Sequence, residues 1–83
     1  MQEQEIGIIT HYYGNLSVGI IELSDTLKVG DTIHVKGTHD DFTQTVDSMQ
    51  IEHNSVNQAQ KGQQIGIKVT GRVHPHDKVY KVG

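Results

Sequence analysis

Short stretches of alternating apolar and polar residues recur along the chain, separated by clusters of Gly, Asn and Asp. Ile and Val outnumber Leu and Ala, and β-branched side chains favour pleated strands over helices. No segment has the spacing of a long amphipathic helix. We therefore expect an all-β protein, with strands over residues 5–12, 17–23, 32–36, 42–52, 63–69 and 73–82.

The alternation also assigns faces to the expected strands. Ile33 and Val35 point the same way, towards the core, because successive side chains of a strand alternate between its two faces. By the same rule, the adjacent Tyr12 and Tyr13 divide into one core residue and one rim residue. Neither face of the 42–52 stretch is fully apolar, so we expect this strand to bend midway, through a bulge. Residues 53–62 are expected to form a polar connection.

A chain of 83 residues corresponds to a single domain, residues 1–83. About six short strands in so small a protein would leave open sheet edges, and closure into a barrel removes such edges. The strand pattern therefore favours a closed β-barrel.

Several classes of function are disfavoured by what the sequence lacks. Without Cys there is no disulfide framework and no thiolate metal site, which fits a reducing cytoplasm. No apolar run is long enough to cross a membrane. The chain has neither a phosphate-binding Gly-x-x-x-x-Gly-Lys-Ser/Thr loop nor a Gly-x-Ser-x-Gly elbow. We expect a cytoplasmic protein that is not an enzyme, binds no GTP and needs no cofactor.

The net charge of −3 hides an asymmetry. Up to Ala59 there are two basic and nine acidic residues, and after it five basic residues and one acidic residue. If the basic residues share one side of the molecule, they form a phosphate-binding stripe and are the RNA-binding candidates: Lys61, Lys68, Arg72, Lys78 and Lys81. The alternative is that acidic and basic segments interleave in space and pair as solvated neighbours.

A second candidate site lies in the run His74-Pro75-His76-Asp77. Two imidazoles one residue apart and a carboxylate are metal-ligand types, so His74, His76 and Asp77 are weak metal candidates. The alternative is an exposed turn that Pro75 fixes and Asp77 caps. Because only two ligands are certain to lie together, no metal site is predicted.

Four segments and two single apolar residues occur in an order and spacing that resemble a known domain. They are Thr-Leu-Lys-Val-Gly-Asp-Thr-Ile at 26–33, Ser-Met-Gln-Ile at 48–51, then Val56 and Ala59, Lys-Gly-Gln-Gln-Ile-Gly-Ile at 61–67 and Asp-Lys-Val-Tyr at 77–80. The set resembles the second, β-barrel domain of elongation factor Tu and related translation GTPases. The chain is thus identified as a free-standing translation elongation factor-like protein. Similar barrels are also appended to collagenase-like peptidase-family proteins.

The resemblance implies a closed six- or seven-stranded Greek-key barrel. It also implies contact with tRNA, although Ser48 stands where the family places a Glu of the aminoacyl-end pocket. We therefore expect a non-catalytic RNA- or ribosome-associated module whose partner is tRNA or rRNA. The alternative is a protein-docking module or small subunit of a larger enzyme, such as a collagenase-like peptidase-family protein, without RNA contact.

Overall fold

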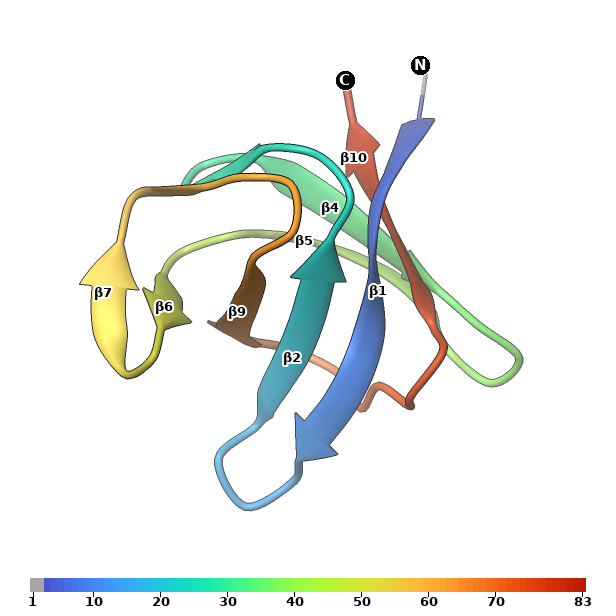
Figure 1. Cartoon of the computed structure of the whole chain (residues 1–83). Coiled ribbons are helices and arrows are strands. Elements are labelled where there is room, and N and C mark those ends of the chain that lie inside the picture. The colour runs from blue at the N-terminus through green and yellow to red at the C-terminus, as the bar shows by residue number, and fades with distance from the viewer. Residues whose placement is uncertain (1–2) are drawn as a thin grey trace.

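The computed structural model describes residues 3–83, and in that range it contains ten strands and no helix (Figure 1). The strands are β1 (Glu3–Tyr13), β2 (Val18–Leu23), β3 (Leu27–Lys28), β4 (Thr32–Lys36), β5 (Asp41–Thr45), β6 (Met49–Ile51), β7 (Asn54–Val56), β8 (Gln58–Ala59), β9 (Gln64–Lys68) and β10 (Lys78–Val82). The all-β expectation is confirmed. Every predicted strand matches an observed one to within a few residues, except the 42–52 stretch and the start of the last strand.

Eight strands form one antiparallel sheet in the order β5-β4-β10-β1-β2-β9-β6-β7, and β3 and β8 form a separate pair. Figure 1 shows that the sheet is strongly curved and that β1 and β10 lie side by side, with Glu3 paired with Val82. Register shifts between Glu5 and Gly7 and between Ile9 and His11 interrupt β1. Such bulges increase twist and bending, so β1 is where the sheet curls.

The expectation of a closed six- or seven-stranded Greek-key barrel is wrong, because β5 and β7 remain the free edges of the sheet. The 42–52 stretch breaks after β5, so that β5 pairs with β4 while β6 pairs with β9 and β7. Side-chain bonds take the place of strand pairing near one edge. The Gln44 amide donates to the Lys68 carbonyl at 2.8 Å and its oxygen accepts from the Thr70 N–H at 2.8 Å.

The concave side of the sheet encloses a single apolar cluster. Its buried members are Ile6, Ile9, Ile21, Leu23, Leu27, Ile33, Val35, Val46, Met49, Ala59, Ile65, Ile67, Val69, Val73 and Val79. The inward assignment of Ile33 and Val35 is confirmed. Tyr12 packs against this core and Tyr13 is exposed, as their adjacency predicts.

The segment 53–62 is not a plain polar connection, because it contains β7 and β8. The β6–β7 hairpin turns at Glu52 and His53, whose φ angles are 50° and 66°. Tight hairpin turns with two such residues usually carry Asn-Gly or Asp-Gly, so Glu-His gives no turn signal in the sequence. Buried Ala59 then pairs with Leu27 and closes the open end of the core.

Candidate functional site

Two loops that are distant in sequence meet beside the ends of β4 and β10. In the β4–β5 loop, the Gly37 N–H donates to the Asp40 carbonyl at 2.7 Å. In the β9–β10 loop, the His74 N–H donates to Asp77 Oδ2 at 2.9 Å, and the Asp77 N–H donates to the His74 carbonyl at 3.1 Å. Asp77 therefore caps its own turn, as the sequence indicates.

Side chains from both loops converge on one cluster, Asp40, His74 and Asp77. His74 Nδ1–H donates to Asp40 Oδ2 at 2.6 Å, and one ligand-type atom of each residue lies within 4.8 Å of the others. Asp77 is only 4% exposed and the Asp40 side chain 9%, whereas the His74 side chain is 47% exposed. The two carboxyl groups of the cluster are thus buried, and the imidazole is partly exposed to solvent.

The pKa values of the two carboxyl groups in this cluster are shifted in opposite directions. Burial raises the pKa of Asp77, and its hydrogen bond with Asp40 raises it further. That same hydrogen bond lowers the pKa of Asp40, and the bond from His74 adds to the lowering against the effect of burial. Neighbouring carboxylates resist carrying two negative charges, so the pair favours one shared proton or a cation.

The structure places only two of the three weak metal candidates in this cluster. His74 and Asp77 lie in the cluster, but His76, with a φ of 78°, lines a neighbouring groove beside Pro75 and Tyr80. Sequence reasoning missed Asp40, which is 34 positions from His74 in the chain. Only the meeting of the two loops brings it into reach, and no local spacing signals it.

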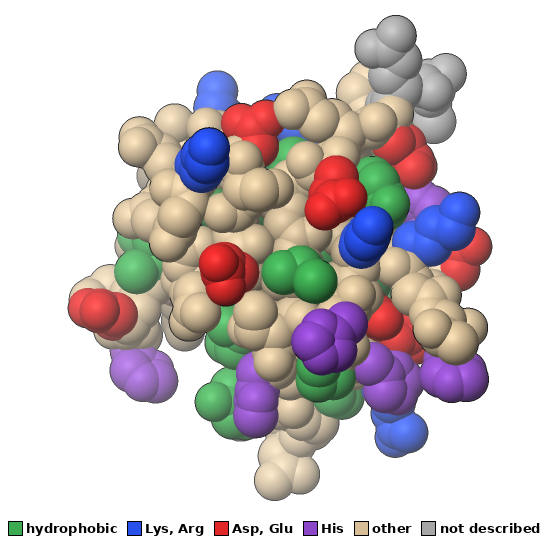
Figure 2. Space-filling model, turned by 45° about the vertical axis from the view of Figure 1, so that its right-hand side comes forward, with side chains coloured by type: hydrophobic (Ala, Val, Ile, Leu, Met, Phe, Trp, Pro, Cys, Tyr) green, Lys and Arg blue, Asp and Glu red, His purple; other side chains and the backbone are tan. Residues whose placement is uncertain are grey.

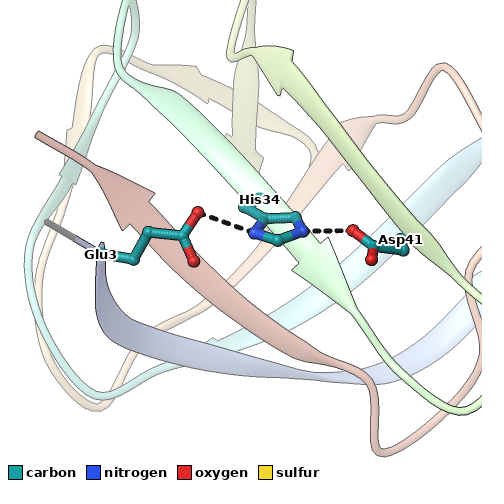
Figure 3. Close-up of polar contacts among 3 residues, drawn as sticks. All are labelled: Glu3, His34 and Asp41. Atoms are coloured by element: carbon teal, nitrogen blue, oxygen red, sulfur yellow. Dashed lines mark hydrogen bonds and ion pairs between the residues drawn. The ribbon is translucent and has the colours of Figure 1, made fainter. Parts of the chain in front are cut away.

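A second polar group crosses the sheet at His34 (Figure 3). Its Nδ1 bonds to Glu3 Oε2 at 2.8 Å and its Nε2 bonds to Asp41 Oδ1. Glu3 lies on β1, His34 on β4 and Asp41 on β5, so the imidazole links three strands. Its hydrogen bond with Asp41 raises the pKa of His34, and the bond with Glu3 adds to this against the opposing effect of burial.

The His34 contacts predict a pH-dependent stability. Because the folded-state pKa lies above the ordinary value of 6.5, the contribution of His34 is complete below pH 6.5 and is lost as pH rises through the folded-state pKa. The thermal midpoint of the wild type should therefore exceed that of His34→Gln at about pH 5.5, and the difference should shrink by about pH 8.5. Thermal melts of both proteins monitored by circular dichroism measure this difference. A gap that is constant with pH would contradict the assignment.

A groove with exposed apolar side chains occupies another part of the surface, between the β1–β2 hairpin, the β6–β7 turn and strands β6 and β9. It has a volume of about 760 Å³ and is lined by Tyr13, Leu16, Val18, Ile20, Gln50, Ile51, Glu52, His53, Gln63, Gln64, Ile65 and Gly66. Leu16 at the turn is 64% exposed, and the exposed Tyr13 ring packs against the His11 ring at a centroid distance of 4.4 Å. The exposed apolar area of the groove thus lies mainly at Leu16 and Tyr13.

Two of the five RNA-binding candidates lie within ion-pair distance of acidic side chains. Lys78 pairs with Glu5 at 3.8 Å, and Lys81 pairs with Asp31 at 3.4 Å. The exposed Lys61, Lys68 and Arg72 lie before β9, at its end and in the loop that follows. On the face drawn in Figure 2, basic side chains are spread among acidic ones. The interleaving that we considered for the charge asymmetry thus occurs at Lys78 and Lys81.

No protein-family model matches the chain. It is 43% identical over 77 residues to an uncharacterized protease of Methanocaldococcus jannaschii, a match that covers 92% of the chain and 19% of the relative. It is 35% identical over 82 residues to a collagenase of Porphyromonas gingivalis, covering 96% and 23%. The chain therefore spans about a fifth of the length of these curated relatives.

A solved structure has the same fold. The C-terminal domain of a putative U32 peptidase of Geobacillus thermoleovorans superposes with a TM-score of 0.91 and 19% sequence identity, covering 96% of this chain and 93% of that one. The selenomethionine variant of that domain gives a TM-score of 0.88. Among residues 3–83 there is no helix long and apolar enough to cross a membrane.

These relatives overturn the identification as a translation elongation factor-like protein, because they are a protease and a collagenase. The RNA-binding expectation, which rested on that resemblance and on the charge asymmetry, gains no support from these relatives. The misleading motif at 26–33 encodes a turn: Gly30 has a φ of 98°, and Asp31 Oδ2 accepts the Lys28 N–H at 2.9 Å. Such turn chemistry recurs in unrelated β proteins, so it specifies local geometry and not function.

Proposed function

We propose that this chain is a non-catalytic docking domain of a peptidase-family protein. It packs, within one polypeptide or as a separate subunit, against the larger part that the curated relatives carry outside the matched region. One observation carries the proposal. The matches include nearly all of this chain but only about a fifth of the length of each relative. The fold shared with a C-terminal domain of a putative U32 peptidase supports it.

The groove beside the β1–β2 turn is the proposed contact surface. The exposed Leu16 and Tyr13 and the half-buried Ile51 present apolar area, and polar residues such as Gln50 and Gln64 form its rim. An apolar centre with a polar rim is the usual anatomy of a protein–protein interface. We propose that this groove binds the part of the peptidase-family protein that corresponds to the unmatched four-fifths of the relatives.

The histidines with described contacts fit a structural role better than a nucleophilic one. In residues 3–83, His34 bonds to Glu3 and Asp41, and His74 bonds to Asp40. These bonds are made to carboxylates and join separate strands or loops. A hydrolase of the serine or cysteine type instead needs a histidine in contact with its nucleophile, and the chain has no Cys. Bond cleavage is accordingly assigned to the larger part of the peptidase-family protein.

Leu16→Asp should weaken docking without unfolding the domain. Leu16 is largely exposed, so the free energy of unfolding should change by at most about 0.5 kcal/mol. A charge within an apolar contact should reduce affinity about tenfold or more, as loss of an interface hot spot does. Affinity capture from extract of the source organism, with captured proteins identified by mass spectrometry, measures this effect.

Asn57→Asp is the matched control, because it adds the same charge at an exposed position that does not line the groove. Wild type and Asn57→Asp should both capture a peptidase-family protein, with and without nuclease, and Leu16→Asp should not. Capture that disappears with nuclease, or that is equal for all three proteins, would refute docking through this groove.

A further inference from the structure

We propose that Asp40, His74 and Asp77 form a binding site for a divalent transition metal ion of the zinc class. The three side chains already converge, with ligand-type atoms within 4.8 Å of one another. A tetrahedral zinc with bonds of about 2.0 Å holds its ligand atoms roughly 3.3 Å apart. The 2.6 Å contact between His74 Nδ1 and Asp40 Oδ2 needs to widen by less than an ångström to admit the ion.

The identity of the donors selects the class of metal. One imidazole nitrogen with two carboxylate oxygens suits zinc and its first-row neighbours better than calcium or magnesium, which prefer oxygen alone. A fourth ligand is at hand in His39, whose ring centroid lies 6.0 Å from that of His74. His39 is exposed on the same β4–β5 loop as Asp40, so it is free to turn towards the ion.

The surroundings of the cluster are built around the acidic pair. Asp77 is almost fully buried and packs on the backbone of Gly37, where a Cβ atom would lie 1.8 Å from Asp77 Oδ1. The glycine thus allows the carboxylate to reach Asp40. Two carboxylates held together in a poorly solvated place are stabilised by a positive partner. His74, half exposed at the mouth, leaves an entry path for an ion.

A bound ion would connect the β4–β5 loop to the β9–β10 loop, which the structure joins through single hydrogen bonds such as the one between His74 and Asp40. Asp40, His74 and Asp77 are not among the residues that line the groove proposed for docking. The metal site therefore stands on its own geometry, and its test is independent of the docking proposal.

The test is calorimetric titration of the purified, chelator-treated protein with zinc. We expect one ion per chain and a rise in the thermal midpoint, since a ligand that binds only the folded state stabilises it. Co²⁺ should give the visible absorption of a tetrahedral complex. Asp40→Asn and His74→Ala should each lose at least about tenfold in zinc affinity, with folding checked by far-ultraviolet circular dichroism.

His53→Asn is the matched control. It removes an exposed imidazole in the β6–β7 turn that is not part of the cluster, and asparagine tolerates the positive φ there. This variant should bind zinc like the wild type. Absence of heat with zinc would overturn the proposal. Equal affinity in the wild type and His74→Ala would overturn it too, since it would show adventitious binding by scattered surface histidines.

Discussion

Replacing Gly37 with alanine is expected to destabilise the protein by about 3 kcal/mol or more, the upper range for over-packing. The new Cβ would lie 1.8 Å from Asp77 Oδ1 and 2.5 Å from Asp77 Cγ. The Asp77 carboxyl group is almost fully buried and cannot move aside without losing the hydrogen bond that it accepts from the His74 N–H. The turn between β4 and β5 would have to shift instead, which disturbs the Asp40 cluster as well.

Urea unfolding followed by circular dichroism measures this effect. Gly14→Ala serves as the control, because its Cβ would meet nothing closer than Tyr12 Cε2 at 3.6 Å. That change should alter the free energy of unfolding by no more than about 0.5 kcal/mol. Equal stability of the two variants would show that Asp77 does not occupy the space above Gly37.

Leu27→Ala is expected to cost about 2–5 kcal/mol, a large share of the stability of so small a domain. Leu27 is fully buried and pairs with Ala59 in the β3–β8 sheet that closes one end of the core. Removing its side chain leaves a cavity. The neighbouring strands cannot move in to fill it because backbone hydrogen bonds hold them in place.

Leu16→Ala removes the same atoms from an exposed position and isolates the effect of burial. Its free energy of unfolding in urea should stay within about 0.5 kcal/mol of the wild type. If Leu27→Ala were as mild as Leu16→Ala, the small β3–β8 sheet would not be part of the core.

Side-chain alternation accounts for what could be predicted of the fold. Strand β4 was predicted with its observed bounds because polar residues flank Ile33 and Val35 on a regular strand. The predicted bend in the 42–52 stretch is present as a break between β5 and β6. The β6–β7 hairpin was missed because Glu52 and His53 adopt positive φ without the residues that normally signal it. Barrel closure was wrong because strand patterns do not encode which edges pair.

The candidate sites were less predictable for a related reason. The turn-capping role of Asp77 is local and could be predicted from His74-Pro75-His76-Asp77. Its partner Asp40 comes from another loop, so only the folded chain reveals the cluster. Contacts between distant segments were also hidden for the basic residues. Lys78 and Lys81 lie close together in the sequence, but their ion-pair partners lie on β1 and in the β3–β4 turn.

Docking to a peptidase-family body is the central claim, and binding calorimetry with purified proteins tests it most directly. The partner is the part of the Methanocaldococcus jannaschii relative outside the matched 77 residues, first shown to be folded by circular dichroism. We predict saturable 1:1 binding of this chain, weakened about tenfold or more by Leu16→Asp and unchanged by Asn57→Asp. Absence of binding to the folded partner, or binding that Leu16→Asp leaves intact, would contradict the claim.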